Sequence, residues 1–541
     1  MAPAARIIVV GGGLSGLSAA HTVYQAGGNV VVLDKQSFFG GNSTKATSGI
    51  NAALTSTQTD NNIADSVKQF YDDALKSARD QARPDLIRVL TYQSASAVEW
   101  LQDVFGLDLT LVSRLGGHSQ PRTHRGHDAK FPGMAITYAL MQRLEDLAER
   151  EPERVQILKK ARATSITKDE NDITGVTYEA EGGTSHHMAG PVIIATGGYA
   201  ADFSGDKSLL KMHRPDTYGL ATTNGSHATG DGQKMILEIG GNGIDMDKVQ
   251  VHPTGLVDPK DPGSKWKFHA AEALRAEGGI LLNADGDRFC DELGHRDYVS
   301  GMIWEEKKRG KFPIWLVLNS KASSTLDFHT RHYSGRGLMK RMSGHELARE
   351  ICYTFHVAVM EPVLHFTMGG VEINAKAQVL NHSGTPFNGL YACSEVAGGV
   401  HGTNRLGGSS LLGCVVYGRV AGDSASNYLN RYRMDDIPGT TGTPKSSLAK
   451  KEFKIPDIEY TIEEVARHNT KEDLWVIVEG VVMDLSDWLD EHPGGPQALM
   501  NFMGHDATEE FEMLHDDEVT PKYSPKQVIG RVKGVEPTLD F

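Results

Sequence analysis

Residues 6–16 read RIIVVGGGLSG, a β-branched run followed at once by a glycine-rich turn. A helical stretch then extends to Ala26, and a second apolar run, 29–33, ends at Asp34. The succession of strand, glycine-rich turn, helix and strand is the start of a βαβ unit. The sequence therefore predicts an α/β fold that opens on a dinucleotide-binding unit.

Four residues of this opening unit have the chemistry that a dinucleotide requires. Gly11, Gly13 and Gly16 form the pattern Gly-x-Gly-x-x-Gly, which lets the backbone and the helix N-terminus approach a pyrophosphate. Asp34 stands 18 residues after the last glycine, where a carboxylate can accept a hydrogen bond from a ribose hydroxyl. The pattern alone fits NAD as well as FAD.

Three further glycine-rich segments favour FAD. They are GGNS at 40–43, ATGG at 195–198 and TGDG at 229–232. Together with the opening unit, they look like the backbone contacts of a two-part FAD-binding domain. Because no second Gly-x-Gly-x-x-Gly follows, a built-in nicotinamide site is not visible.

Several other segments have a recognisable periodicity. Helical patterns are expected at 62–78, 83–105, 133–150 and 411–428, and an apolar strand is expected at 192–195. Helices that alternate with buried apolar strands are typical of an α/β protein with a parallel sheet.

Length and composition are those of a large globular protein. The chain has 541 residues, of which 39% are hydrophobic and 23% charged, enough for several domains. No apolar run approaches the roughly 18 residues of a membrane span, and the N-terminus has no basic, apolar leader. We therefore expect a cytoplasmic protein without a membrane span.

Acidic residues are concentrated near the C-terminus. The net charge is −14, and residues 457–541 alone hold 20 Asp and Glu against 6 Lys and Arg. Because a nucleic-acid binder needs a basic surface, this distribution argues against a nucleic-acid partner. It favours docking on a basic protein surface.

Two late segments complete the flavin pattern, LYACSEV at 390–396 and GGVHGTNRLGG at 398–408. With the glycine-rich segments, they resemble the flavoprotein family of fumarate reductases and succinate dehydrogenase flavoprotein subunits. The similarity covers about residues 6–428 and is greatest to the soluble fumarate reductases.

This resemblance implies a domain organisation. A Rossmann-like FAD-binding domain would cover 1–246 and 365–432, with an α+β capping domain, 247–364, inserted into it. A linker rich in Pro, Gly, Ser, Thr and Lys would follow at 433–456. Members of the family carry more helix and loop than this chain does after Ile351, so we expect either a shortened cap or a sequence that lacks a segment there.

The resemblance also implies the residues that contact FAD. Membrane-bound relatives tether the flavin through a histidine, and none occurs between Ser43 and Ala53, so FAD would be held without a covalent bond. Besides the fingerprint glycines and Asp34, the expected contacts are Lys35, Gly41, Asn42, Ser43, Thr47, Ser48, Gly49, Thr196, Gly197, Gly198, Asp231, Glu395, Ser410 and Leu411.

A site for a small dicarboxylate, fumarate or succinate, is implied in the same way. Taken singly, a histidine before a proline or an arginine in a loop is more often a packing or surface residue. The resemblance assigns the binding of the two carboxylates to His252, His365 and Arg405.

The remaining implied residues concern a proton. Arg296 would donate it to the substrate carbon, and Glu272 and Arg275 would resupply it. Because arginine has a pKa of about 12 or more, such a transfer must be concerted with reprotonation. Otherwise Arg296 acts only as an electrostatic clamp on the developing carbanion.

The C-terminal segment resembles a different family. Residues 475–485 read as strand, turn and strand, and HPGG at 492–495 is followed by His515. This text resembles cytochrome b5 over 457–534 and implies a small α+β domain that binds haem b. Its iron would be ligated by His492 and His515, an arrangement suited to electron transfer.

The combined expectation is an FAD-dependent fumarate reductase, an oxidoreductase acting on CH–CH groups, that receives electrons through a tethered b5 haem. A basic protein similar to a b5 reductase would be the electron donor. One alternative is another reaction of the family, such as aspartate oxidation or ketosteroid dehydrogenation. A second is a haem electron carrier with an inactive flavin domain.

Overall fold

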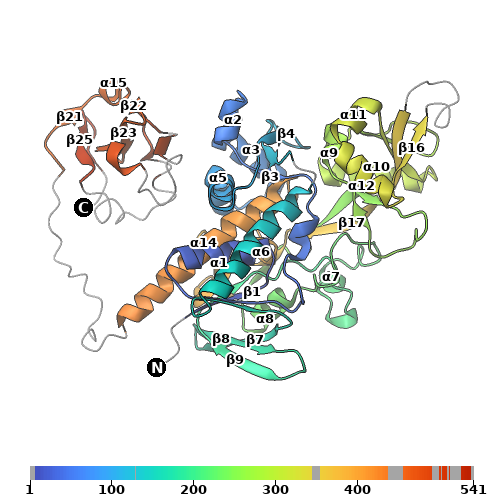
Figure 1. Cartoon of the computed structure of the whole chain (residues 1–541), viewed down its shortest axis with the longest axis horizontal. Coiled ribbons are helices and arrows are strands. Elements are labelled where there is room, and N and C mark those ends of the chain that lie inside the picture. Colours follow the sequence, from blue (N-terminus) through green and yellow to red (C-terminus); the bar gives the residue numbers. More distant parts are fainter. Residues whose placement is uncertain are drawn as a thin grey trace. The chain divides into compact units, whose positions relative to one another are not determined.

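The computed structural model describes residues 6–127, 130–343, 354–435, 455–489, 499–500, 502–508, 511 and 526–537. The chain divides into two compact units, Met1–Met434 and Asp435–Phe541. Within the larger unit, a mainly parallel sheet and an antiparallel sheet pack around separate apolar cores (Figure 1).

The mainly parallel sheet contains the strands that the sequence predicts at its opening. Its order is β6 (Val155–Leu158), β2 (Val30–Leu33), β1 (Ile7–Val10), β10 (Val192–Ile194), β20 (Pro386–Ala392), β8 (Asp172–Glu179) and β7 (Arg162–Asp169). β1 pairs in parallel with β2 on one side and with β10 on the other. The winding reverses between β1 and β10, and sheets of this kind bind ligands at such a switch point, beyond the carboxyl ends of the strands.

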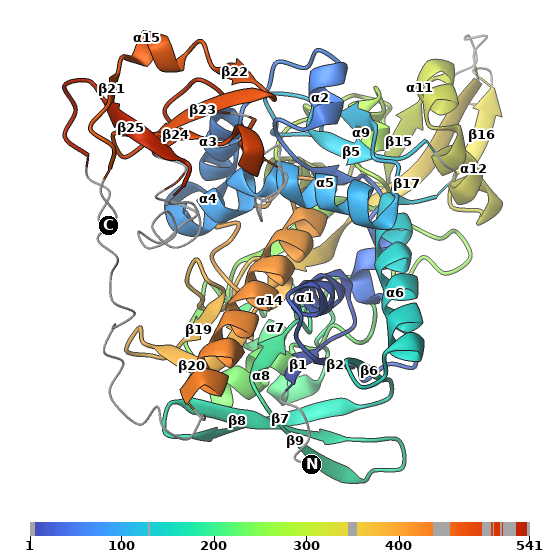
Figure 2. The same ribbon diagram turned by 60° about the vertical axis from the view of Figure 1, so that its left-hand side comes forward.

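Helices α1 (Leu14–Gln25), α6 (Pro132–Arg150) and α14 (Ser409–Asp435) lie side by side against this sheet (Figure 2). The backbones of α1 and α14 approach each other closely. A Cβ atom on Gly418 of α14 would lie 2.5 Å from the carbonyl oxygen of Ser15 in α1. Glycine at this position therefore allows the two helices to pack.

Two of the predicted helices differ from the prediction. The segment 62–78 is helical only from Val67, where α3 (Val67–Ala78) begins. The segment 83–105 forms two helices, α4 (Pro84–Tyr92) and α5 (Ser94–Phe105), separated at Gln93. Besides short 3-10 helices, the other described elements of this part are α2 (Ser56–Asp60), α7 (Leu209–His213), α8 (Asp231–Glu238), β3 (Ile50–Asn51), β4 (Leu111–Ser113), β5 (Thr123–Arg125), β9 (Ser185–Ala189), β11 (Gly243–Ile244), β18 (Gly370–Val371) and β19 (Gln378–Leu380).

The antiparallel sheet lies in the range 247–364 predicted for the cap, except for the last three residues of β17. Its order is β13 (Phe268–His269), β12 (Val249–Leu256), β17 (Thr354–Thr367), β15 (Ile314–Leu318) and β14 (Ile280–Leu282), and β16 (Lys340–Ser343) also pairs with β17. The helices beside it are α9 (Ala273–Ala276), α10 (Arg296–Lys308), α11 (Ser320–Thr325) and α12 (Asp327–Gly335).

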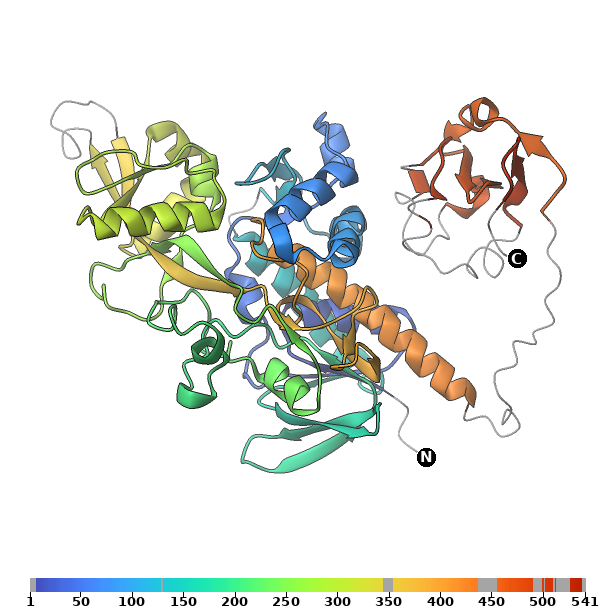
Figure 3. The same ribbon diagram turned by 180° about the vertical axis from the view of Figure 1, so that it is seen from behind.

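Strand β17 runs from the outer part of this sheet toward the mainly parallel sheet (Figures 1 and 3). Its ladder with β12 has two irregularities, between Gln250 and Val251 and between His252 and Gly255. The predicted shortening after Ile351 lies outside the described residues.

The smaller unit contains a sheet in the order β21 (Glu459–Tyr460), β25 (Val528–Val532), β24 (Val481–Asp484), β23 (Asp473–Val478) and β22 (Asn469–Thr470), and a short helix, α15 (Ile462–Val465). The predicted strand, turn and strand are confirmed: β23 and β24 form a hairpin in which Glu479 and Gly480 have φ of 50° and 79°. His492 and His515 lie outside the described residues. Throughout the described chain, no helix combines the length and apolar character that crossing a membrane requires.

Candidate functional site

A cavity of about 500 Å³ lies in the larger unit, where β1 and β10 end. The glycine-rich turn, the segment after β2 and the N-terminus of α14 line one part of it, and residues of the antiparallel sheet line another. The predicted FAD contacts that line the cavity are Gly11, Gly13, Asp34, Lys35, Gly41, Asn42, Ser43, Thr47, Ser48, Gly49, Thr196, Gly197, Asp231, Glu395, Ser410 and Leu411.

The glycine-rich turn brings the N-terminus of α1 to the cavity. Gly13 is the N-cap of α1 and has no side chain that could cap the first N–H groups. Gly16 does not line the cavity; a Cβ atom there would lie 1.9 Å from the carbonyl oxygen of Gly11. Gly16 therefore lets the helix start directly against the turn, which leaves helix N–H groups available to an anion.

Asp34 and Lys35 follow β2 at the cavity wall. The Asp34 carboxylate accepts hydrogen bonds from the backbone N–H groups of Gly12 and Gln36, both at 2.7 Å. Burial raises the pKa of Asp34. The Lys35 ammonium group lies 2.9 Å from the Asp231 carboxylate, so these two predicted contacts form an ion pair with each other.

Gly198, like Gly16, does not line the cavity. Its lack of a side chain leaves room for the carboxyl group of Glu395. A Cβ atom on Gly198 would lie 2.4 Å from Oε1 of Glu395. The same carboxyl oxygen accepts a hydrogen bond from the backbone N–H of Thr367 at 2.9 Å. Burial raises the pKa of Glu395 to about 7, so this cavity-lining carboxyl group can act as a donor or as an acceptor near neutral pH.

The cavity fits a flavin dinucleotide in its polar chemistry. Buried polar groups are normally hydrogen-bonded, yet Thr196 Oγ1 and His227 Nε2 are buried in its wall without a partner in the described chain. Thr196 belongs to one of the glycine-rich segments that favour FAD, and His227 lies two residues before another. These atoms, the N-terminus of α1 at the cavity wall and the Asp34 carboxylate together offer donors and acceptors to a polar ligand.

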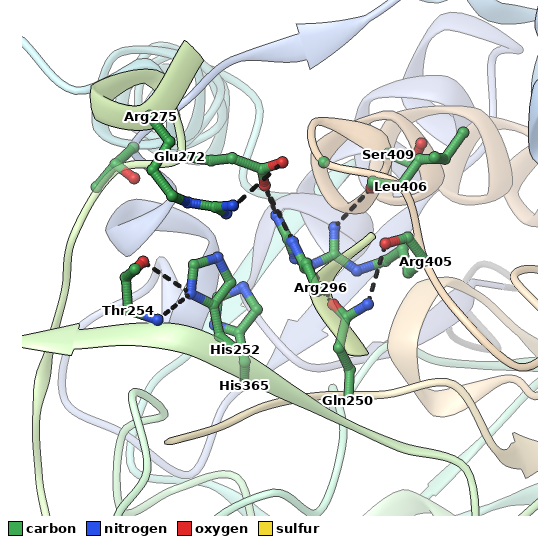
Figure 4. A network of polar contacts seen from close by, with 12 residues as sticks. Gln250, His252, Thr254, Glu272, Arg275, Arg296, His365, Arg405, Leu406 and Ser409 are labelled. Carbon is green, nitrogen blue, oxygen red and sulfur yellow. Dashed lines mark hydrogen bonds and ion pairs between the residues drawn. The ribbon is translucent and has the colours of Figure 1, made fainter. Parts of the chain in front are cut away.

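A buried charge cluster lies beside the cavity (Figure 4). Arg296 donates to Oε2 of Glu272 from Nε at 3.0 Å and from Nη2 at 2.5 Å. Arg275 follows Glu272 at i+3, and its Nη2 lies 3.9 Å from Oε1. Gln250 joins the third arginine, Arg405, to Arg296, because its Oε1 accepts from Arg405 at 3.3 Å and from Arg296 at 2.8 Å.

The charges in this cluster do not balance. Burial opposes ionisation of Glu272, but the charges of Arg296 and Arg275 lower its pKa to about 2. Burial and the charge of Arg296 lower the pKa of Arg405 to about 9. At pH 7 three guanidinium groups therefore face one carboxylate. Arg296 and Arg405 line the cavity, which gives it an excess of positive charge suited to an anionic ligand.

Three imidazoles form a second cluster. The Nε2 atoms of His252 and His269 lie 3.0 Å apart, and the ring centre of His365 lies 4.9 Å from that of His252 and 4.8 Å from that of His269. Burial lowers the pKa of each ring, that of His269 to about 3, so all three are neutral at pH 7. His269 and His365 line the cavity, whereas His252 is completely buried.

The structure thus brings together the six residues predicted for substrate and proton, and adds Gln250 and His269. Gln250 lies two positions before His252 in β12, so the period of two in a strand could have identified it. His269 belongs to β13 and pairs with Gly255 of β12, a contact that no pattern in the sequence signals.

Comparison with family models separates the same two parts of the chain. Residues 6–411 match the FAD binding domain family, and residues 461–533 match the cytochrome b5-like heme/steroid binding domain family. The chain therefore contains an FAD-binding domain and a cytochrome b5-like domain.

Known relatives agree with the first of these matches. The chain is 47% identical to the fumarate reductase of Schizosaccharomyces pombe, over 79% of this chain and 90% of that protein. It is 40% identical to fumarate reductase 1 of Saccharomyces cerevisiae, over 78% of this chain and 98% of that protein.

Among solved structures, the open conformation of a flavocytochrome c3 fumarate reductase is similar, with a TM-score of 0.66 and 30% sequence identity over 79% of each chain. The fold, the cavity and these similarities agree with one another. The chain belongs to the FAD-binding flavoprotein family that includes the fumarate reductases, and it carries a cytochrome b5-like domain as well.

Proposed function

We propose that this chain is an FAD-dependent reductase that converts fumarate to succinate. The observation that carries the proposal is the excess of buried positive charge at one cavity of an FAD-binding fold, formed by Arg275, Arg296 and Arg405 against Glu272. The net positive charge of this arginine cluster is complementary to the two carboxylates of fumarate. When bound, FAD supplies a hydride from N5 to a substrate carbon.

The predicted FAD contacts hold the cofactor in this proposal. The turn at Gly11 and Gly13 brings the N-terminus of α1 to the pyrophosphate, and Gly16 allows the helix to start there. Asp34 accepts hydrogen bonds from the ribose with the lone pairs that Gly12 and Gln36 leave free. The remaining predicted contacts that line the cavity surround the rest of the cofactor without a covalent bond.

Substrate binding follows from the positions of the cationic and imidazole groups. Arg405 and His365 line the cavity and bind substrate carboxylates in the proposal. The Arg405 guanidinium also lies over the ring of Phe366, 4.3 Å from its centre, which holds its plane. His252 was predicted to bind a carboxylate too, but it is completely buried and reaches the cavity only through its neighbours.

Arg296 donates the proton in this mechanism. Its Nε and Nη2 groups are held by Glu272 and its Nη1 group by Gln250, so the guanidinium plane is fixed at the cavity wall. Because Glu272 is already ionised, it can receive a proton from Arg275 and return it to Arg296 as Arg296 delivers its own. If this transfer does not occur, the same geometry still stabilises negative charge on the substrate carbon.

The cytochrome b5-like domain supplies electrons in the proposal. We expect His492 and His515 to ligate haem iron, which when bound supplies one-electron transfer. The acidic composition of residues 457–541 supports a basic electron donor similar to a b5 reductase. The cytoplasmic location and the domain boundaries at 246, 364, 432 and 456 stay predictions.

The alternatives make different demands on the cavity. A ketosteroid carries no carboxylate, so three buried guanidinium groups would face an uncharged substrate. Aspartate brings an ammonium group as well as two carboxylates, and the cluster has a single carboxylate, Glu272, already paired with Arg296 and Arg275. Both comparisons favour a small dicarboxylate without an amine.

A direct assay tests the proposal. Purified protein is supplied with reduced viologen, and the oxidation of the dye is followed with fumarate, aspartate or a ketosteroid present. Fumarate alone should cause oxidation, with succinate as the product. A protein that binds FAD but oxidises no viologen with fumarate would instead be the electron carrier with an inactive flavin domain.

A further inference from the structure

His269 occupies a central place among the side chains around the cavity. It is the last residue of the short strand β13 and pairs with Gly255 in β12. Its side chain therefore lies close to that of His252, which is also in β12. The rings of His269 and His252 meet edge to face, with centres 4.2 Å apart, and His269 stacks on His365 at an interplanar angle of 27°. Its second nitrogen, Nδ1, lies 3.1 Å from Thr47 Oγ1.

His269 and His252 differ in whether their side chains reach the cavity. His269, His365 and Thr47 line it, whereas His252 has no exposed surface. A ligand in the cavity therefore meets His269 first on this side.

The hydrogen bonds determine which nitrogen of each ring carries the proton. The backbone N–H of Thr254 donates to His252 Nδ1 at 3.2 Å, so this nitrogen accepts through its lone pair and carries no proton. Because the ring is neutral, its proton is on Nε2, which donates to His269 Nε2. His269 is neutral as well, and its proton is therefore on Nδ1, directed at Thr47.

We propose that His269 binds a carboxylate of the substrate through Nδ1–H, and that His252 acts as a positioning residue that fixes the tautomer and orientation of His269. This inference rests on the proposed function, since it concerns the same dicarboxylate. In this structure Thr47 Oγ1, 3.1 Å from Nδ1, accepts the Nδ1–H hydrogen bond. A substrate carboxylate would replace Thr47 as the acceptor, and the Thr47 hydroxyl would then be free to donate to the other oxygen of the same carboxylate. The substrate-facing imidazoles are then His269 and His365.

Amide variants separate the two nitrogens. In His269→Asn the side-chain amide can place an N–H near the position of Nδ1, whereas in His269→Gln the amide reaches the position of Nε2 and leaves Nδ1 without a replacement. The ligand is malonate, a dicarboxylate without a CH–CH bond to oxidise, and its affinity is measured by titration calorimetry on the purified, FAD-loaded full chain.

We expect His269→Asn to bind malonate within a few-fold of the unsubstituted protein. His269→Gln and His269→Leu should bind it roughly 10- to 100-fold more weakly, the usual effect of losing a hydrogen bond to a charged group. The matched control is His332→Leu, which removes another cavity-lining histidine, one that accepts a hydrogen bond from Arg336. It should leave malonate binding unchanged.

The malonate affinities of His269→Asn and His269→Gln test whether Nδ1–H binds the carboxylate, even if His269→Leu fails to fold. Asn and Gln variants of equal malonate affinity overturn the inference, whether both bind tightly or both bind weakly. Failure of the proposed function is a separate result, because it shows as an unsubstituted protein that binds malonate but does not oxidise reduced viologen with fumarate.

Discussion

Arg296 directs two guanidinium nitrogens at one oxygen of Glu272, at 3.0 Å and 2.5 Å, and both side chains are buried. The second carboxylate oxygen is left to Arg275, 3.9 Å away. Glu272 therefore faces the two arginines with different oxygens, and it is hydrogen-bonded to Arg296 alone of the two. A relay between them requires the 3.9 Å separation from Arg275 to shorten to hydrogen-bond length. The arrangement also means that Glu272 cannot lose either partner without leaving a buried charge partly uncompensated.

Replacing Arg296 tests the role of this pair. Arg296→Ala should lower the rate of fumarate reduction by about 10²- to 10³-fold or more, since a positioned donor to developing charge is lost. The FAD content, read from the visible spectrum, should not change. Arg331→Ala, which removes an exposed arginine paired with Asp327, is the control and should keep full activity. Near-normal turnover of Arg296→Ala would exclude it from the mechanism.

The pH dependence of dicarboxylate binding follows from the cation and imidazole groups. Burial lowers the pKa of Arg405 to about 9, so raising the pH through this value removes a positive charge from the free enzyme. Malonate affinity should therefore fall above about pH 9. Because burial also lowers the pKa of His252, His269 and His365, these rings should add no step near pH 6.5. A step near pH 7 is expected only from Glu395, whose pKa burial raises to about 7, and Glu395→Gln should remove it. A step near pH 6.5 that persists in Glu395→Gln would show that one of the imidazoles is protonated in solution.

Gly16 should be intolerant of any side chain. A Cβ atom would lie 1.9 Å from the carbonyl oxygen of Gly11, so Gly16→Ala must displace α1 from the turn. We expect a loss of FAD and a decrease of about 1–3 kcal/mol in the free energy of unfolding. Gly301→Ala, in α10, is the control because nothing lies within 4 Å of the added atom. It should raise stability slightly, by about 0.5–1 kcal/mol. Equal FAD retention by both variants would contradict this account.

Acid precipitation should release the flavin into the supernatant, because no histidine occurs between Ser43 and Ala53. The absorbance of supernatant and pellet measures this directly. A yellow pellet would show a covalent bond. His227→Gln would then be the first variant to prepare, because His227 Nε2 is buried in the cavity wall without a partner in the described chain.

The haem prediction has an internal control. His492→Ala should abolish the b-type spectrum and slow fumarate reduction by a partner reductase, but not reduction by viologen, which reaches the flavin directly. His505 lies between the two predicted ligands and is exposed, so His505→Ala should retain the spectrum. Loss of haem from the His505 variant, with retention in the His492 variant, would reverse the assignment.

The parts of the fold that the sequence predicts well are those that a local pattern determines. The turn after β1 requires glycine for steric reasons, and the hairpin at Glu479 and Gly480 joins two runs of apolar residues. The break at Gln93 was missed because the apolar periodicity continues through α4 and α5. A pattern of period 3.6 cannot show where one helix ends and another begins in the same direction.

The site shows a similar division. The six residues assigned by resemblance meet in one place, but the sequence did not indicate that Gln250 bridges two arginines or that His269 lies between His252 and the cavity. Both contacts depend on which strands pair and in which register. His269 in particular depends on a two-residue strand opposite Gly255, which is too short to have a recognisable period.

The irregular ladder between β12 and β17 has a mechanical consequence. The two breaks in its register lie on either side of Val251 and His252, and β17 carries His365 close to the same level. A strand pair bends and twists most easily where its ladder is interrupted. Any tilt of the outer sheet against the flavin-domain sheet would thus be taken up at the histidines themselves. The same part of the β12–β17 ladder would then act as the hinge and carry ligand-binding residues, so that tilting the sheet also moves the imidazoles that face the cavity.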